Sequence, residues 1–190
     1  MYSNKQYSLV HQICLKVYEN EIINDRQKED ALYFIALSSK GMFNDDVKYW
    51  LEQFLIEYPY SLRVNNINYE LALYYFRNAN YQKAISYFLT CKSKLDEYNF
   101  KLAYSYFVID SIESAKYYYS KLLNKDSKYS STSLYFYAHI AYKQKHYTTA
   151  LSSFLSLKDD NNFASIIPYY ISQIYFSQKR YDELISYAKP

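Results

Sequence analysis

The sequence contains very little glycine, proline or cysteine. Among 190 residues there are one Gly, three Pro and two Cys. A β-sandwich needs many tight turns, which rely on Gly and Pro, so this composition argues against one. A single Gly also excludes the glycine-rich loops that hold phosphate groups. Cys14 and Cys91 lie far apart without a zinc-ligand spacing, and we expect both to be buried apolar groups.

Long apolar runs and strong charge of one sign are also missing. No stretch of about 18 apolar residues is present, so the sequence predicts no membrane-spanning helix. The first 20 residues lack the apolar centre of a signal peptide because polar and charged residues interrupt it. The net charge is only +3, with acidic and basic residues mixed along the chain. The sequence therefore predicts no basic stripe that would meet nucleic-acid phosphates.

What the chain does have is 28 tyrosines, and the aromatic residues follow a repeated pattern. A small residue is followed by a Tyr, and then by Tyr-x-x-Ala-x-x-x-aromatic. Four copies occur in phase, with the central small or apolar residue at Ala84, Ala115, Ala150 and Leu184. Successive copies are 31, 35 and 34 residues apart. Two weaker copies precede them, so the pattern predicts a repeat architecture along nearly the whole chain.

This pattern resembles the tetratricopeptide repeat (TPR) family, whose repeat of about 34 residues has the order Trp-x2-Leu-Gly-x2-Tyr, then Ala-x3-Phe, then Pro. The chain departs from the family in lacking the Trp in each unit. The family's first-helix Gly is replaced here by Ala72, Ala103, Ala138 and Ser172, and the family's terminal Pro is present only as Pro59. The stretches Phe43–Pro59 and Tyr135–Tyr142 are further similar to long TPR arrays of Gram-negative bacterial envelope proteins, which implies a periplasmic or envelope location.

The resemblance implies an all-α, right-handed α-solenoid of antiparallel helix pairs, with about five repeats and roughly 10–11 helices. We expect one superhelical domain over residues 1–190. Its expected units are residues 1–25, 27–60, 65–95, 96–129, 131–161 and 164–190. Because the first recognisable element is only the second half of a repeat, we also expect a piece of a longer array, with exposed apolar side chains on the terminal helices.

The local signals predict eleven helices. Gly41 is expected at a helix end, Asp45 and Asp46 in a first helical turn, and Pro168 in the first turn of a later helix. Connecting loops are expected at Asp126–Ser127 and at Asp159–Asn162. The expected helices are residues 4–19, 27–39, 44–58, 65–78, 81–94, 97–109, 112–124, 131–144, 147–157, 164–178 and 181–188.

Small residues recurring on both helices of a pair predict close helix crossings. Ala on each partner lets the axes approach to the short end of the 8–10 Å range. Aromatic side chains are then expected to fill the wedge between pairs, since each buries about 150–250 Å². The expected wedge residues are Tyr75, Phe88, Tyr106, Tyr119 and Phe154.

The TPR resemblance implies that the first helix of each unit lines a concave face that binds peptides or protein tails. Most positions expected there are aromatic, which disfavours the cluster of Lys, Asn and Arg with which some TPR domains hold a C-terminal carboxylate. The expected binding residues are Tyr69, Leu73, Phe76, Arg77, Phe100, Tyr104, Phe107, Val108, Tyr135, His139, Tyr142, Lys143, Tyr169, Gln173 and Phe176.

These observations predict a non-enzymatic scaffold that binds a protein or peptide partner on an aromatic face. No nucleophile–base pair or metal-ligand spacing stands out around His11, His139 or His146, so we expect no catalytic residue, no metal and no cofactor. Two other hypotheses stay open. Tyrosine rings could stack on a glycan or small molecule, and helical repeats of this length can read single-stranded RNA, although the low net charge disfavours the latter.

Overall fold

The structure is a computed structural model that describes residues 4–91, 93 and 95–188. Within these residues it contains eleven α-helices and no β-strand, and each helix predicted from the sequence is present, with its ends displaced by four residues at most. The helices are α1 (Asn4–Tyr18), α2 (Asp25–Met42), α3 (Val47–Glu57), α4 (Val64–Arg77), α5 (Tyr81–Thr90), α6 (Asp96–Val108), α7 (Ile112–Ser120), α8 (Ser130–Lys143), α9 (Tyr147–Leu155), α10 (Ile167–Ser177) and α11 (Tyr181–Ala188).

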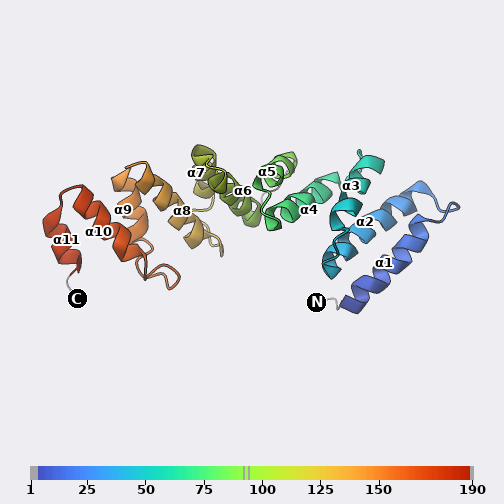
Figure 1. The fold of residues 1–190 in the computed structure, drawn as a ribbon, viewed down its shortest axis with the longest axis horizontal. Coiled ribbons are helices and arrows are strands. Elements are labelled where there is room, and N and C mark those ends of the chain that lie inside the picture. Colours follow the sequence, from blue (N-terminus) through green and yellow to red (C-terminus); the bar gives the residue numbers. More distant parts are fainter. Residues whose placement is uncertain (1–3, 92, 94, 189–190) are drawn as a thin grey trace. The chain divides into compact units, whose positions relative to one another are not determined.

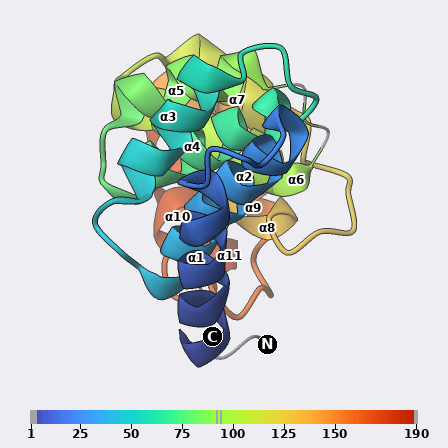
Figure 2. The ribbon, with the colours of Figure 1, turned by 90° about the vertical axis from the view of Figure 1, so that its right-hand side faces the viewer.

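The chain divides into two compact units, Met1–Lys92 and Ser93–Pro190. Helices α1–α5 belong to the first unit and α6–α11 to the second (Figure 1). Within each unit, every helix packs against the next one along the chain. Figure 2 shows the helices of the first unit from the N-terminal side, with α1 in front. Consecutive packing of this kind defines an all-α array of helix pairs of the solenoid type.

The turns inside the helix pairs repeat one backbone geometry. After each of α2, α4, α6, α8 and α10, one residue adopts a left-handed conformation with φ between 55° and 62°. The next backbone N–H then donates to a carbonyl five residues earlier, at 2.8–3.0 Å. This is the hydrogen bond of a Schellman motif, which satisfies carbonyls at the helix end. The left-handed residues are Phe43, Ala79, Asp110, Lys145 and Lys179.

The small residues at the predicted crossings are buried, and in the second unit each pair belongs to one hydrophobic cluster. Ala72 and Ala84 in the first unit have no exposed surface, and neither do Ala103 and Ala115 or Ala138 and Ala150 in the second. Of the aromatic wedge residues, Tyr75, Phe88, Tyr119 and Phe154 are buried, whereas Tyr106 is half-buried and stacks on Tyr118. Buried Ala residues and aromatic rings are thus part of the core, together with buried Leu and Ile side chains.

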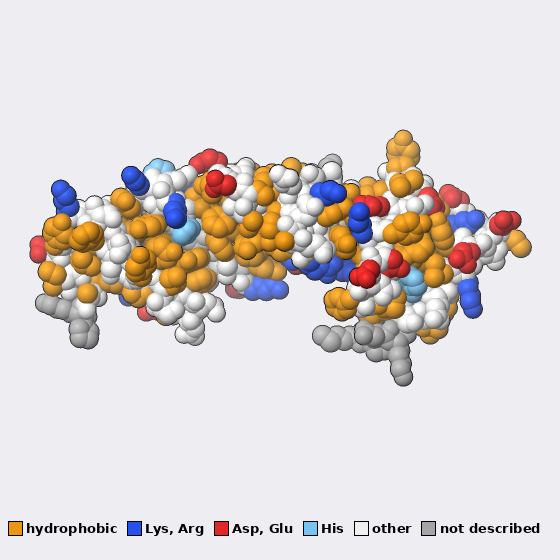
Figure 3. All heavy atoms as spheres, in the orientation of Figure 1, with side chains coloured by type: hydrophobic (Ala, Val, Ile, Leu, Met, Phe, Trp, Pro, Cys, Tyr) orange, Lys and Arg blue, Asp and Glu red, His pale blue; other side chains and the backbone are white. Residues whose placement is uncertain are grey.

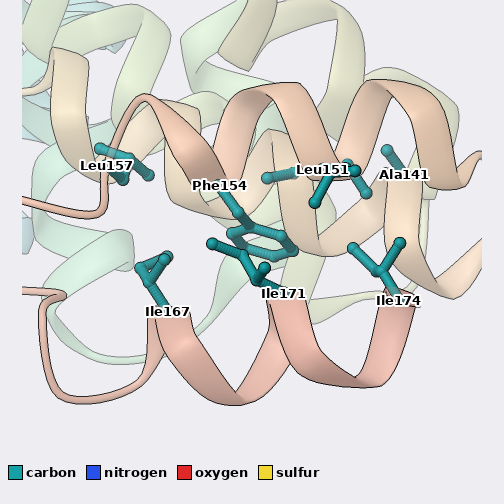
Figure 4. Close-up of a cluster of buried hydrophobic side chains, with 9 residues drawn as sticks. Ala141, Leu151, Phe154, Leu157, Ile167, Ile171 and Ile174 are labelled. Atoms are coloured by element: carbon teal, nitrogen blue, oxygen red, sulfur yellow. The ribbon is translucent and has the colours of Figure 1, made fainter. Parts of the chain in front are cut away.

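The core of the second unit is shown in Figure 4. The Phe154 ring of α9 lies over Ile171, and Ile167 and Ile174 flank it along the same face of α10. All four side chains are fully buried. Pro168 lies in the first turn of α10, as predicted, where its missing N–H costs no helical hydrogen bond.

Three local predictions were wrong. Gly41 does not end a helix: it lies inside the last turn of α2, and Phe43 is the left-handed residue that closes that turn. Asp45 and Asp46 precede α3 instead of lying in its first turn, and Asp46 accepts a hydrogen bond from the Trp50 Nε1 at 3.0 Å. Cys91 is buried, but Cys14 is only half-buried.

Large apolar side chains are exposed on the first and last helices, as expected. Leu9 and Ile13 of α1 are 58% and 52% exposed. Tyr181 and Ile185 of α11 are 50% and 56% exposed, and α11 has no buried residue. These side chains leave apolar surface on each unit.

Candidate functional site

In the second unit, several predicted binding residues pack against aromatic rings of the next first helix. Tyr104 of α6 makes an edge-to-face contact with Phe136 of α8, with ring centroids 5.9 Å apart, and Phe107 lies 5.1 Å from the same ring. Tyr135 of α8 lies 6.2 Å from Tyr170 of α10. The rings of successive first helices thus form a connected aromatic network that holds α6, α8 and α10 in register.

The centres of this network are residues that sequence reasoning missed. Tyr170 contacts Tyr135, His139 and Tyr142 and stacks on Phe154 with centroids 4.8 Å apart. Its neighbour Tyr169, which the repeat pattern predicted as a binding residue, is 60% exposed. Burial raises the pKa of Tyr170 to about 12, so its phenol is neutral at ordinary pH. The predicted aromatic face is therefore largely inter-helix packing, not open groove.

A small hollow remains at one edge of this network. It has a volume of about 430 Å³ and is lined by residues from the end of α6, the start of α7 and the end of α8 with the turns that follow α6 and α8. His139 lines it, and the buried Nδ1 of His139 has no hydrogen-bond partner in the described part of the chain. Burial, followed by the nearby Lys143, lowers the pKa of His139. The imidazole is accordingly neutral near pH 7.

The remaining predicted residues are placed differently. In the first unit, Tyr69 lies beside Phe88, and Phe76 beside Tyr81, both as edge-to-face pairs. Leu73, Phe100 and Gln173 are half-buried, and Phe100 stacks on Tyr129. The exposed side chains of the predicted set are Arg77, Val108, Lys143, Tyr169 and Phe176.

A larger hollow lies in the first unit. It is a groove of about 830 Å³ bounded by α1, α2 and α4, and we call it the α1–α2–α4 groove. Most of its lining surface is apolar. Arg77 is the only predicted binding residue in it. The lining residues are Gln6, Tyr7, Val10, Cys14, Phe34, Leu37, Ser38, Lys40, Gly41, Phe43, Asn66, Glu70 and Arg77.

The spacing of side chains along α2 explains why one face of this helix forms a wall of the groove. Phe34, Leu37, Ser38 and Gly41 recur at three- and four-residue intervals, so they share one face of the helix. Phe34 is 46% exposed, and Phe43 at the end of α2 is 82% exposed. In the space-filling view, hydrophobic side chains cover broad areas of the visible surface (Figure 3). The groove therefore offers large apolar groups to a partner without further unfolding.

Polar contacts fix the walls of the groove. On α1, the His11 ring lies 3.2 Å from the hydroxyls of Ser38 and Ser39 on α2. On the other side, the Lys40 ammonium pairs with the largely buried Glu70 carboxylate of α4 at 2.6 Å. A buried charge keeps its partner close because an unpaired one would be costly. These contacts link α2 to both neighbours across the groove.

The positive charge of Arg77 is available at the groove. Arg77 is exposed and forms no ion pair within the described residues, although Asp45 lines a neighbouring hollow of about 240 Å³ with it. Arg guanidinium groups bind carboxylates with two parallel hydrogen bonds. Among the charged residues that line the groove, Lys40 and Glu70 neutralise each other, so Arg77 leaves it with a net positive charge.

Cys14 provides a thiol inside the groove. It is half-buried and unpaired, and burial raises its pKa. The second cysteine, Cys91, is buried outside the groove, and burial raises its pKa to about 11. Both thiols are poor nucleophiles at neutral pH, but only Cys14 lines a surface that a ligand could cover.

One sequence signal could have pointed to the groove. Gly41 is the single glycine, and a Gly inside a helix usually marks a close approach. A Cβ added at Gly41 would meet the Tyr7 ring of α1 at 2.6 Å. The apolar lining itself had no such signal, because Phe34 and Leu37 look like ordinary core positions until α1 and α4 are placed around them.

No group of three or more His, Cys, Asp or Glu side chains in the described residues is arranged to hold a metal ion. Nor does any helix of that part of the chain combine the length and apolar character required to cross a membrane. No family model matches the chain, and no curated protein matches it in sequence. The fold defines an all-α array of helix pairs, and the TPR resemblance stays a prediction made from the residues.

Proposed function

We propose that this chain is a non-catalytic binding module of the TPR type whose α1–α2–α4 groove holds an apolar peptide segment that carries an acidic residue. The observation that carries this proposal is the groove itself: about 830 Å³, mostly apolar, with a cation that forms no ion pair in the described part of the chain. Its volume lies within the range of roughly 300–1,000 Å³ typical of ligand sites.

Burial of apolar surface supplies the favourable free energy. Each Å² of apolar surface removed from water contributes about 25 cal/mol. Phe34 and Phe43 are the largest exposed apolar groups of the groove, and Val10 on the opposite wall is 39% exposed. A partner that lays apolar side chains along the groove would cover these exposed groups. Peptides bind helical grooves in this way through a few spaced apolar anchors.

Among apolar peptides, the charge of Arg77 favours those that carry an acidic residue. A partner carboxylate beside the anchors would meet Arg77, whereas a partner Lys or Arg would be repelled. Opposite charges across an interface mainly affect specificity and association rate. We therefore expect acidic peptides to bind more tightly than otherwise identical basic ones.

The first test is selection of random 12-residue peptides on the intact chain, followed by affinity measurement for the selected peptides. We expect apolar anchors together with Asp or Glu. Phe34→Glu should weaken their binding at least tenfold, and Arg77→Glu should weaken it while relaxing the acidic preference. Ile56→Glu is the matched control, since Ile56 is 71% exposed and outside the groove. Equal loss with Ile56→Glu, or no loss with Phe34→Glu, would refute the groove as the binding site.

A second test locates the peptide without any substitution. Cys14 lies in the groove and Cys91 does not. A saturating selected peptide should slow maleimide labelling of Cys14, measured by mass spectrometry of the digested protein. Labelling of Cys91 should stay unchanged. If Cys14 reacts at the same rate with and without peptide, the ligand binds elsewhere on the chain, for example on the aromatic network of the second unit.

A further inference from the structure

The segment between α3 and α4 presents two large apolar side chains wholly to solvent. Tyr60 is 98% exposed and Leu62 is 101% exposed relative to an extended reference. We call residues 58–63 the α3–α4 loop. Surface apolar residues are common singly, but two neighbouring ones at full exposure form a projecting apolar group that water solvates poorly.

The base of this loop is held in place. Ser61 donates to Glu29 of α2 at 2.5 Å, and its backbone N–H donates to the Tyr58 carbonyl at 3.1 Å. Arg63 pairs with Asp30 of α2 at 2.5 Å and lies over the Tyr33 ring at 4.6 Å. Because Ser61 and Arg63 are fixed on α2, the two exposed side chains are presented by an ordered loop, which lowers the entropy cost of binding through them.

The surroundings of the loop are acidic. Glu57 is exposed at the end of α3, where it accepts hydrogen bonds from the neutral donors Tyr18 and Gln53. Asp25 accepts a hydrogen bond from the Tyr58 phenol at 3.4 Å. Neither carboxylate has a cationic partner within the described residues. An anionic membrane surface would be repelled here, so the loop fits a partner that combines an apolar cavity with positive charge.

The same chain contains such a cavity. The α1–α2–α4 groove is mostly apolar, carries the unpaired Arg77, and at about 830 Å³ has room for one Tyr and one Leu side chain. We propose that the α3–α4 loop of one copy inserts Tyr60 and Leu62 into the α1–α2–α4 groove of a second copy, with Glu57 placed toward Arg77. This inference rests on the proposed function, because it names a second copy of the chain as an occupant of the same groove.

A projecting apolar group on one surface and a complementary cavity on another give a head-to-tail contact, which either closes into a ring or continues into a filament. Each copy then donates one loop and offers one groove. Two variants that each lack one half of the contact should therefore be monomeric alone and should pair when mixed. This behaviour separates the proposed contact from general hydrophobic aggregation.

The experiment is sedimentation velocity on the intact chain between about 1 and 200 µM, a range that covers ordinary transient association. We expect concentration-dependent association of the parent chain. The double variant Tyr60→Ser with Leu62→Ser should associate at least tenfold more weakly, as should the groove variant Phe34→Glu. Mixing the two variants should restore pairs of one copy each. Ile22→Ser is the matched control, because Ile22 is 93% exposed in another loop of the first unit.

Folding is checked by circular dichroism. Tyr60 and Leu62 are fully exposed, so their replacement should leave the melting temperature unchanged. If Phe34→Glu lowers helicity, Val10→Glu on the opposite wall replaces it in the mixture. A parent chain that stays monomeric at 200 µM, or variants that do not pair when mixed, would overturn the inference. If the parent chain stays monomeric but still binds the selected peptides, only this inference fails and the proposed function survives.

Discussion

Replacement of Gly41 by Ala tests a close approach between α1 and α2. In a helix interior, Ala is more stable than Gly by about 0.5–1 kcal/mol. Here the added Cβ would lie 2.6 Å from Cδ1 and Cε1 of the Tyr7 ring and 2.7 Å from its Cγ. Ordinary carbon–carbon contacts are about 3.5–4.0 Å. The ring or the whole of α1 must therefore move.

Overpacking of this kind costs about 1–3 kcal/mol, which exceeds the helix-propensity gain. We expect Gly41→Ala to lower the free energy of unfolding by about 1 kcal/mol, near the middle of the roughly 0–2.5 kcal/mol that the difference between the two effects spans. The half-buried Tyr7 lies in α1, so the loss should appear first there. Urea denaturation gives the global value, and amide hydrogen exchange reports the opening of α1.

A double-mutant cycle of Gly41→Ala with Tyr7→Ala tests whether the Tyr7 ring causes the loss of stability. In a Tyr7→Ala background the ring is gone, so Gly41→Ala should reverse its sign and stabilise the chain by about 0.5–1 kcal/mol. A stabilising effect of equal size with and without Tyr7 would mean that the two helices do not approach at Gly41. In that case Gly41 and Tyr7 would not lie next to each other in the α1–α2–α4 groove.

Three further predictions follow from other parts of the structure. Ala138→Leu adds bulk at a fully buried helix crossing and should lower the free energy of unfolding by about 1–3 kcal/mol. An unchanged melting temperature would mean that the helices do not cross at Ala138. Ala79→Gly should add about 1 kcal/mol of stability, because Ala79 is left-handed with φ 55°; urea denaturation measures it, and a loss would be inconsistent with that conformation. Burial raises the pKa of Tyr170 to about 12. Burial, and after it the nearby Glu52 carboxylate, raises the pKa of Tyr75 to about 12 as well. Since an unfolded tyrosine titrates near 10, the unfolded state loses these protons first, so their stabilisation is complete below about pH 10 and is lost as the pH rises toward 12. Phenolate absorbance and circular dichroism recorded together check this, and unchanged urea stability between pH 10 and 12 would refute it.

The exposure of individual aromatic side chains was harder to predict than the helices. Repeat spacing placed Tyr135 and Tyr142 on the first helices correctly, but it could not tell Tyr169 from Tyr170, because adjacent aromatic positions on a helix differ by 100° of rotation and both fit a broad apolar stripe. Only packing against Phe154 distinguishes the half-buried ring from the exposed one. Nothing in the sequence indicated that Phe34 would remain exposed on a groove wall.

The sequence by itself determined the eleven helices, their pairing and the buried Ala crossings, because these depend on periodicity within one repeat and on contacts between neighbours along the chain. The tertiary structure decided where apolar surface stays open. Whether a side chain such as Tyr7 or Phe43 is covered depends on the angle and spacing at which separate helices meet, and those are set by the summed packing of many side chains, which no local pattern records.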